Sequence, residues 1–253
     1  MSIPSWGITV VGVVLAFGGF TGLGLVFRYT GVLSWLADRY GPLTATNITK
    51  WVATGGLLAF VVGIEGRGIG SITLNALPAW QLLIYAVMGY FAMIVGMGVV
   101  TLILRRVGLI EPRDDVIQAS PRVFSSHDDG PINIGDQSWS VLLATAVTAG
   151  ATEEILTTGY PVVRIAEATG VPALGIAVSA VVFGLLHRGY SWPYAIITMV
   201  PGLVFGAVFW LSGSLLTVIV MHTLWDVLAF GVRKFRGQQV RQAMRRAGPD
   251  VEG

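Results

Sequence analysis

Residues 138–158 read SWSVLLATAVTAGATEEILTT, an apolar run of helix length that carries two consecutive glutamates, Glu153 and Glu154. An ionisable side chain at the centre of a bilayer costs about 2.5–3.5 kcal/mol even on the mildest insertion scales, so such residues indicate a functional site by default. Later apolar runs carry three more ionisable side chains, His187, His222 and Asp226. We therefore expect the chemistry of this chain where these five groups share a common interior.

Composition places the chain in a membrane. Of its 253 residues, 54% are hydrophobic and only 12% are charged, and the mean hydropathy is +0.72. Such a chain has too little polar surface to cover a soluble globule, and its apolar runs are long enough to cross a hydrocarbon core of about 30 Å. Its basic residues flank apolar runs, so we expect no nucleic-acid partner. The absence of cysteine excludes thiol nucleophiles and cysteine-ligated zinc.

Hydropathy windows of spanning length predict an all-α, polytopic fold with about seven transmembrane helices. The predicted helices cover residues 6–27, 47–64, 81–104, 138–158 with a possible continuation to 168, 171–187, 193–211 and 213–231. These helices divide the chain into an N-terminal three-helix membrane region (1–104), a polar cytosolic loop (105–137), a four-helix C-terminal core (138–231) and a basic cytosolic tail (232–253). The first run is too long for a cleaved signal sequence, so it predicts a retained helix.

The distribution of basic residues predicts the orientation. With the C-terminus in the cytosol, nearly all lysines and arginines lie on the cytosolic side, including Lys50, Arg188 and Arg233, and only Arg67 and Arg164 lie outside. The positive-inside rule produces this asymmetry when the number of spans is odd. We expect an integral protein of a prokaryotic plasma membrane, with its N-terminus outside.

Three short patterns bring reactive side chains onto single helix faces. His222 and Asp226 are four residues apart, which places their β-carbons about 6 Å from each other on one face. Phe183 and His187 have the same spacing. Consecutive helical residues point about 100° apart, so one of the two glutamates should face the site while the other supports it.

This set of groups indicates hydrolysis by an activated water. Two histidines with carboxylates hold a metal with an open coordination position, for which zinc is the candidate and His187 and His222 are the candidate ligands, or they work without metal. The chain has no G-x-S-x-G nucleophile elbow, which disfavours a covalent serine mechanism.

In this order on successive apolar helices, the three patterns resemble the motifs EExxxR, FxxxH and HxxxN/D of the CAAX-protease and bacteriocin-processing (CPBP or Abi) family of intramembrane endopeptidases. The resemblance implies that Glu153 activates a water. It implies that His187, His222 and Asp226 hold a metal or stabilise the oxyanion, with Glu154 in support.

One position departs from the family pattern. Thr158 stands where the family has arginine, so the second glutamate lacks a charge partner one turn away. Arg164 lies about 15 Å further along a straight helix from Glu154, and it would return only if Gly159 and Pro161 bent the chain sharply. The departure indicates either a distinct subgroup or a loss of activity.

The sequence therefore predicts an intramembrane endopeptidase that cleaves a membrane-associated or prenylated peptide or protein in contact with the lipid bilayer. Two alternatives from other classes stay open. One is a non-catalytic membrane scaffold of the same family that binds a partner protein. The other is a proton-coupled transporter that uses the glutamates and histidines as a relay.

Overall fold

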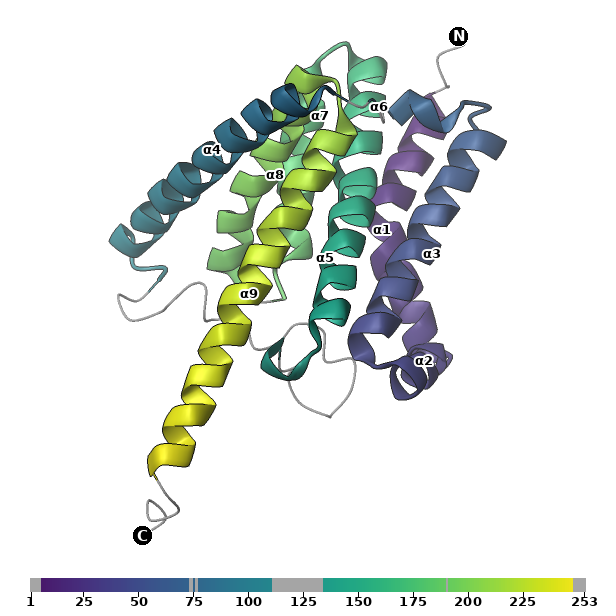
Figure 1. Ribbon diagram of the computed structural model, residues 1–253. Helices are drawn as coiled ribbons and strands as arrows, with labels where there is room; N and C mark the ends of the chain where they lie inside the picture. The colour runs from purple at the N-terminus through teal and green to yellow at the C-terminus, as the bar shows by residue number, and fades with distance from the viewer. Residues whose placement is uncertain (1–5, 73–74, 76, 111–133, 190, 248–253) are drawn as a thin grey trace.

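The computed structural model of the protein describes residues 6–72, 75, 77–110, 134–189 and 191–247. These residues form helices and connecting turns without a strand, which confirms the predicted all-α fold (Figure 1). The α-helices are α1 (Trp6–Tyr29), α2 (Val32–Tyr40), α3 (Pro42–Gly63), α4 (Ala79–Arg106), α5 (Trp139–Glu153), α6 (Tyr160–Thr169), α7 (Pro172–Leu186), α8 (Trp192–Ser212) and α9 (Leu215–Ala247).

Five helices in the described part of the chain are long and apolar enough to cross a membrane: α1, α3, α4, α8 and the first part of α9 (Leu215–Phe235). Several large apolar side chains of α4, such as Leu83, Val87 and Phe91, point out of the bundle, where lipid tails would cover them. The protein is thus a polytopic membrane protein. The two other predicted spans correspond to the shorter α7 and to the run from α5 to α6, so the count of seven stays a prediction.

The run from α5 to α6 is one continuous helical segment with a π-helical turn, Glu154–Gly159, in its middle. Ser138 caps its start, where the hydroxyl accepts a hydrogen bond from the Val141 N–H. Gly170, with φ of 71°, ends it. The segment therefore continues past the predicted end at residue 158 to Thr169, close to the alternative end at 168.

Pro161 helps to explain how this segment packs. Proline has no N–H, so it cannot donate the helical hydrogen bond to the carbonyl of Thr157. The hydroxyl of Ser179 on α7 donates to that carbonyl instead. The carbonyl that Pro161 leaves without a helical partner thus connects the π-helical turn to α7.

The structure corrects two sequence predictions about the helices. A short helix, α2, lies between α1 and α3, where no helix was predicted. The last helix does not end at residue 231 but continues to Ala247, so most of the predicted tail is helical. Residues 111–133 of the predicted cytosolic loop lie outside the described residues.

A buried ion pair joins α6 to the end of α3. The Arg164 guanidinium donates to Glu65 Oε2 from Nε at 2.9 Å and from Nη2 at 2.7 Å, and both side chains are fully buried. Such a pair survives burial because charge-assisted hydrogen bonds offset the lost solvation. The sequence prediction counted Arg164 as a charge on the outer side of the membrane, and the structure adds that its side chain is buried and paired with Glu65. Nearby, a hydrogen bond to Glu167 raises the pKa of Arg67 above its usual value.

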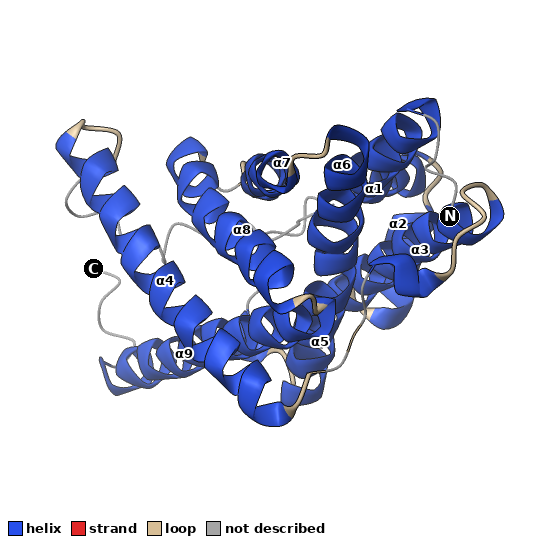
Figure 2. Ribbon diagram, turned by 90° about the horizontal axis from the view of Figure 1, so that it is seen from above, coloured by secondary structure: helices blue, strands red, loops and turns tan. Residues whose placement is uncertain are grey.

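The N-terminal helices pack directly on the C-terminal ones. α3 lies against α5, and α1 lies against α3 and α6. Seen from above, α5 is next to α9, and α7 lies between α6 and α8 (Figure 2). The division of the chain into four regions stays a prediction, but the packing shows that α1 and α3 form one wall of the interior bounded by α5, α7 and α9.

Candidate functional site

Close backbone contact between α5 and α9 brings the glutamates to the histidine motif. A β-carbon placed on Gly150 would lie 2.9 Å from the Ile219 carbonyl oxygen, which is closer than real β-carbons approach. Only glycine allows the two helices to lie this near. One turn after Gly150, Glu154 at the start of the π-helical turn meets His222 of α9.

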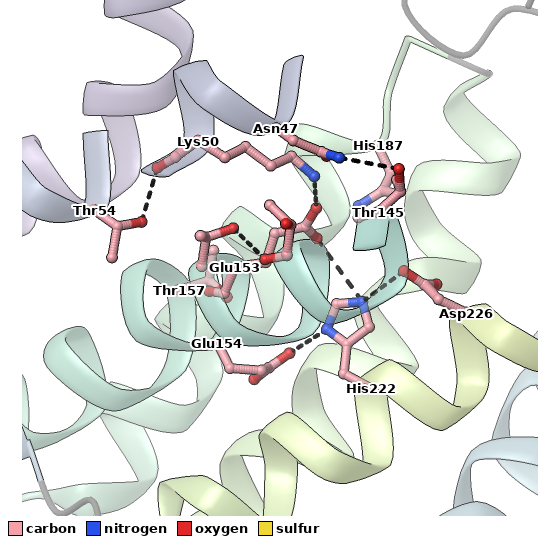
Figure 3. A network of polar contacts seen from close by, with 12 residues as sticks. Asn47, Lys50, Thr54, Thr145, Glu153, Glu154, Thr157, His187, His222 and Asp226 are labelled. Carbon is pink, nitrogen blue, oxygen red and sulfur yellow. Dashed lines mark hydrogen bonds and ion pairs between the residues drawn. The ribbon is translucent and has the colours of Figure 1, made fainter. Parts of the chain in front are cut away.

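His222 is at the centre of the polar network drawn in Figure 3. Its Nδ1 lies 2.7 Å from Glu154 Oε1. Its Nε2 lies 3.9 Å from Glu153 Oε2 and 3.8 Å from Asp226 Oδ2. Polar atoms at these separations are suited to bridging by a water molecule. The structure therefore brings four of the five predicted residues into contact around one imidazole.

Aromatic rings fix the orientation of that imidazole. Phe205 stacks on the His222 ring with centroids 5.2 Å apart, and Phe183 meets it edge-on at 5.8 Å. Phe183 also lies 4.8 Å from the ring of His187. The phenylalanine of the FxxxH pattern thus packs between the two histidines.

His187, the fifth predicted residue, lies at the end of α7. Its Nδ1 is 2.7 Å from the Phe183 carbonyl oxygen. Because a carbonyl can only accept, the hydrogen in this contact belongs to His187 Nδ1, and Nε2 is the atom left to act. The ring borders the same cavity as Glu153 and His222.

That cavity has a volume of about 480 Å³, within the range of small-ligand and substrate sites. It is bounded by α1, α3, α5, α7 and α9 together with the start of α8. Glu153 lines it and keeps 23% of its side chain exposed, whereas Glu154 does not line it and its side chain is fully buried. The two consecutive glutamates therefore face different surroundings.

Lys50 of α3 is a site residue that the sequence reading missed. Its ammonium forms an ion pair with Glu153 Oε1, and the residue is only 7% exposed (Figure 3). The sequence prediction used Lys50 only as a charge on the cytosolic side and gave it no role in the site. The signal was available, because a lysine inside an apolar helix meets the same criterion that singled out the glutamates.

At Thr158, where the family has arginine, no described arginine side chain takes over the contact with Glu154. Thr158 is fully buried in the π-helical turn, and its hydroxyl and Glu154 Oε2 lack a hydrogen-bond partner of normal geometry among the described residues. Arg164 does not return to this position, since it binds Glu65. The contact that Glu154 does make is with His222.

The described residues do not assemble a metal-binding cluster. No group of three or more His, Asp or Glu side chains among them is arranged to hold an ion. Next to the histidines, Glu153 already has a cationic partner in Lys50, and a divalent ion at the same carboxylate would meet that positive charge. We therefore derive no chemical step through a metal.

Comparison with protein families gives a match over residues 135–228, to the family described as type II CAAX prenyl endopeptidase Rce1-like. The match covers α5 to α8 and the first part of α9, and hence all five predicted site residues, whereas Lys50 lies outside it. No curated protein and no solved structure matches the chain significantly. At the level of the family, the match implies intramembrane CAAX protease activity. The chain thus carries, in residues 135–228, a domain of the type II CAAX prenyl endopeptidase Rce1-like family, which confirms the family resemblance of the three motifs.

Proposed function

We propose that the protein is an intramembrane endopeptidase in which Glu153 activates the attacking water. The observation that carries this proposal is the exposure of Glu153 to the cavity, at the point where His222 Nε2 and the Asp226 carboxylate converge. A general base must lie within reach of the proton that it removes, directly or through one water. Of the two consecutive glutamates, only Glu153 lines the cavity.

In the proposed reaction, a water between Glu153 and His222 attacks the carbonyl carbon of the scissile peptide bond. Glu153 takes one proton from this water, and the new C–O bond turns the carbonyl oxygen into an oxyanion. The C–N bond then breaks as the proton passes to the leaving nitrogen, so peptide and water become an acid and an amine. In this proposal the Lys50 ammonium, which pairs with Glu153 Oε1, also lies near the oxyanion and stabilises its negative charge.

Glu154 has a supporting role in this proposal. Its hydrogen bond to His222 Nδ1 fixes which ring nitrogen faces the cavity, as carboxylates do for catalytic histidines elsewhere. Phe205 and Phe183 hold the ring plane. The imidazole is thus oriented before a substrate arrives, and this preorganisation lowers the reorganisation needed during the reaction.

The proposed substrate is a membrane-associated protein or peptide with a C-terminal C-a-a-X motif. Such a motif carries a prenyl group on its cysteine. The cavity reaches apolar side chains of α1, including Ala16, Phe17 and Phe20, which suit an apolar chain. We further propose that the C-terminus of the protein is cytosolic, from the distribution of its basic residues.

The purified protein in liposomes provides the test of this function. A prenylated C-a-a-X peptide should be cut at one bond, and liposomes with a pH gradient should show no proton flux caused by the protein. Peptide binding without cleavage would instead favour the non-catalytic scaffold, and coupled proton flux without cleavage would favour the transporter.

Replacing Thr158 by arginine should destabilise the protein without raising turnover. Thr158 is fully buried, and inserting a larger side chain into a packed interior costs about 1–3 kcal/mol. Glu154 already contacts His222. We therefore expect the positive charge of the new arginine to add nothing to catalysis. Turnover and melting temperature measured together check this. A faster enzyme of unchanged stability would show that the site lacks its arginine.

The peptidase should stay active after thorough removal of divalent metal. The physical reason is the pairing of Glu153 with the Lys50 ammonium, which provides the positive charge that a metal would otherwise supply. Cleavage rate and metal content are measured before and after dialysis against a chelator. This prediction is contradicted if chelation abolishes cleavage, zinc restores it, and His187→Ala and His222→Ala each lower the zinc content of the purified protein.

A further inference from the structure

Two arginine side chains border the cavity. Arg188, at the end of α7, and Arg233 on α9 both line it. The other described arginines at helix ends, Arg28, Arg39, Arg105 and Arg106, do not. The positive-inside rule explains basic residues at the cytosolic ends of helices. It does not explain why these two arginines border the same cavity as the candidate base.

Arg233 belongs to the same face of α9 as the reactive groups. The face that lines the cavity consists of His222, Trp225, Asp226, Ala229, Phe230 and Arg233. Along the helix axis, Arg233 lies about 10 Å from Asp226 and about 16 Å from His222, at 1.5 Å per residue. An extended peptide advances about 3.3 Å per residue, so three residues cover about 10 Å. From a scissile carbonyl between Glu153 and His222, three such residues cover about 10 Å of the roughly 16 Å to the Arg233 backbone. The long Arg233 side chain, which is close enough to Asp226 to interact with its charge, covers the rest.

The carboxylates of the cavity have cationic or histidine partners, whereas its two arginines lack a carboxylate partner in the described part of the chain. The acidic groups at the centre are paired, Glu153 with Lys50 and Glu154 with His222. Among the described residues, neither Arg188 nor Arg233 has a carboxylate within ion-pair distance, although Asp226 and Tyr194 lie near enough to Arg233 to interact with its charge. Arginine presents a planar fork of N–H donors that matches a carboxylate.

We propose that Arg188 and Arg233 form a subsite that binds the free C-terminal carboxylate of the substrate. The proposal rests on the proposed peptidase function and adds to it the residues that recognise the end of the chain. A C-a-a-X substrate ends three residues after its cysteine, which brings its carboxylate within reach of the Arg233 side chain when the scissile carbonyl is at Glu153. The subsite determines which peptide bond is cut, because a C-terminal carboxylate bound there places the bond three residues upstream at Glu153.

Paired peptides with the same sequence test the subsite, one ending in a free acid and one in a carboxamide. In phosphatidylcholine liposomes, the full-length protein should cleave the acid with kcat/KM about 10–100-fold higher than the amide, mainly through a lower KM, since a factor of ten corresponds to one good charge-assisted contact. Arg233→Gln and Arg188→Gln together should reduce this preference to nearly one. The control is Arg28→Gln, at an exposed position of α1, which should keep the full preference.

Each other outcome has a definite meaning. Equal cleavage of both peptides by the native protein would overturn the subsite while leaving the peptidase function intact, whereas cleavage of neither would overturn both. A carboxamide peptide that ends in glutamate and is cut as fast as the free acid would show that the chain end is not what is recognised. If the double variant changes only the response to anionic lipid, the arginines bind lipid phosphates and the proposal fails.

Discussion

Glu153→Gln should abolish nearly all peptide cleavage, with a loss of about 10²–10⁴-fold in kcat, the usual contribution of a general base. The amide keeps the shape of the side chain and can still accept a hydrogen bond from Lys50, but it cannot take a proton from water. The melting temperature should change little. The measurement is the rate of product formation from a C-a-a-X peptide in liposomes, beside thermal unfolding of the same preparation.

Two glutamine variants provide the comparison for this result. Glu167→Gln on α6 changes a glutamate that does not line the cavity and should leave the rate unchanged. Glu154→Gln should reduce the rate less than Glu153→Gln, because Glu154 orients His222 and does not reach the water. Undiminished cleavage by Glu153→Gln, or a larger loss in Glu154→Gln, would assign the base elsewhere.

Lys50→Met should lower kcat by about 10²-fold, comparable to the removal of one electrostatic contact to the transition state, with little change in KM. The substitution removes the positive charge beside Glu153 while keeping most of the apolar side chain. Because the role is electrostatic, Lys50→Arg should restore a large part of the rate. The measurement is kcat and KM for both variants, with the melting temperature of each.

Lys234 offers a matched control for this experiment. It is also a buried lysine, but its ammonium donates to the carbonyls of Gly135 and Gln137, away from the cavity. Lys234→Met should therefore lower stability without a specific loss in kcat. If both lysine variants lose activity in proportion to their stability, or if Lys50→Arg is as slow as Lys50→Met, Lys50 has a structural role only.

Hydropathy predicted the helices that consist of long apolar runs. It predicted neither the short helix α2 nor the π-helical turn. The runs that became α1, α4 and α8 were apparent from hydropathy because each is continuous. The π-helical turn was not predicted, because hydropathy carries no information about the hydrogen-bond pattern inside a helix. α2 is too short and too polar for a window of spanning length to find.

For the site, spacing predicted which residues share a face but not which helices meet. The four-residue spacing of His222 and Asp226 and the alternation of Glu153 and Glu154 are properties of one helix, and the structure agrees with both. Lys50 and Glu153 are far apart in the chain, and only the packing of α3 on α5 brings them together. The same applies to Arg164, whose partner Glu65 lies beyond the end of α3.

The most direct measurement is the mass spectrum of a prenylated C-a-a-X peptide after incubation with the purified protein in liposomes. The proposed hydrolysis predicts two fragments whose masses sum to that of the substrate plus one water, with the cut three residues from the C-terminus. An intact peptide after prolonged incubation with the folded protein would contradict the central claim that the Glu153 cavity is the active site of a peptidase.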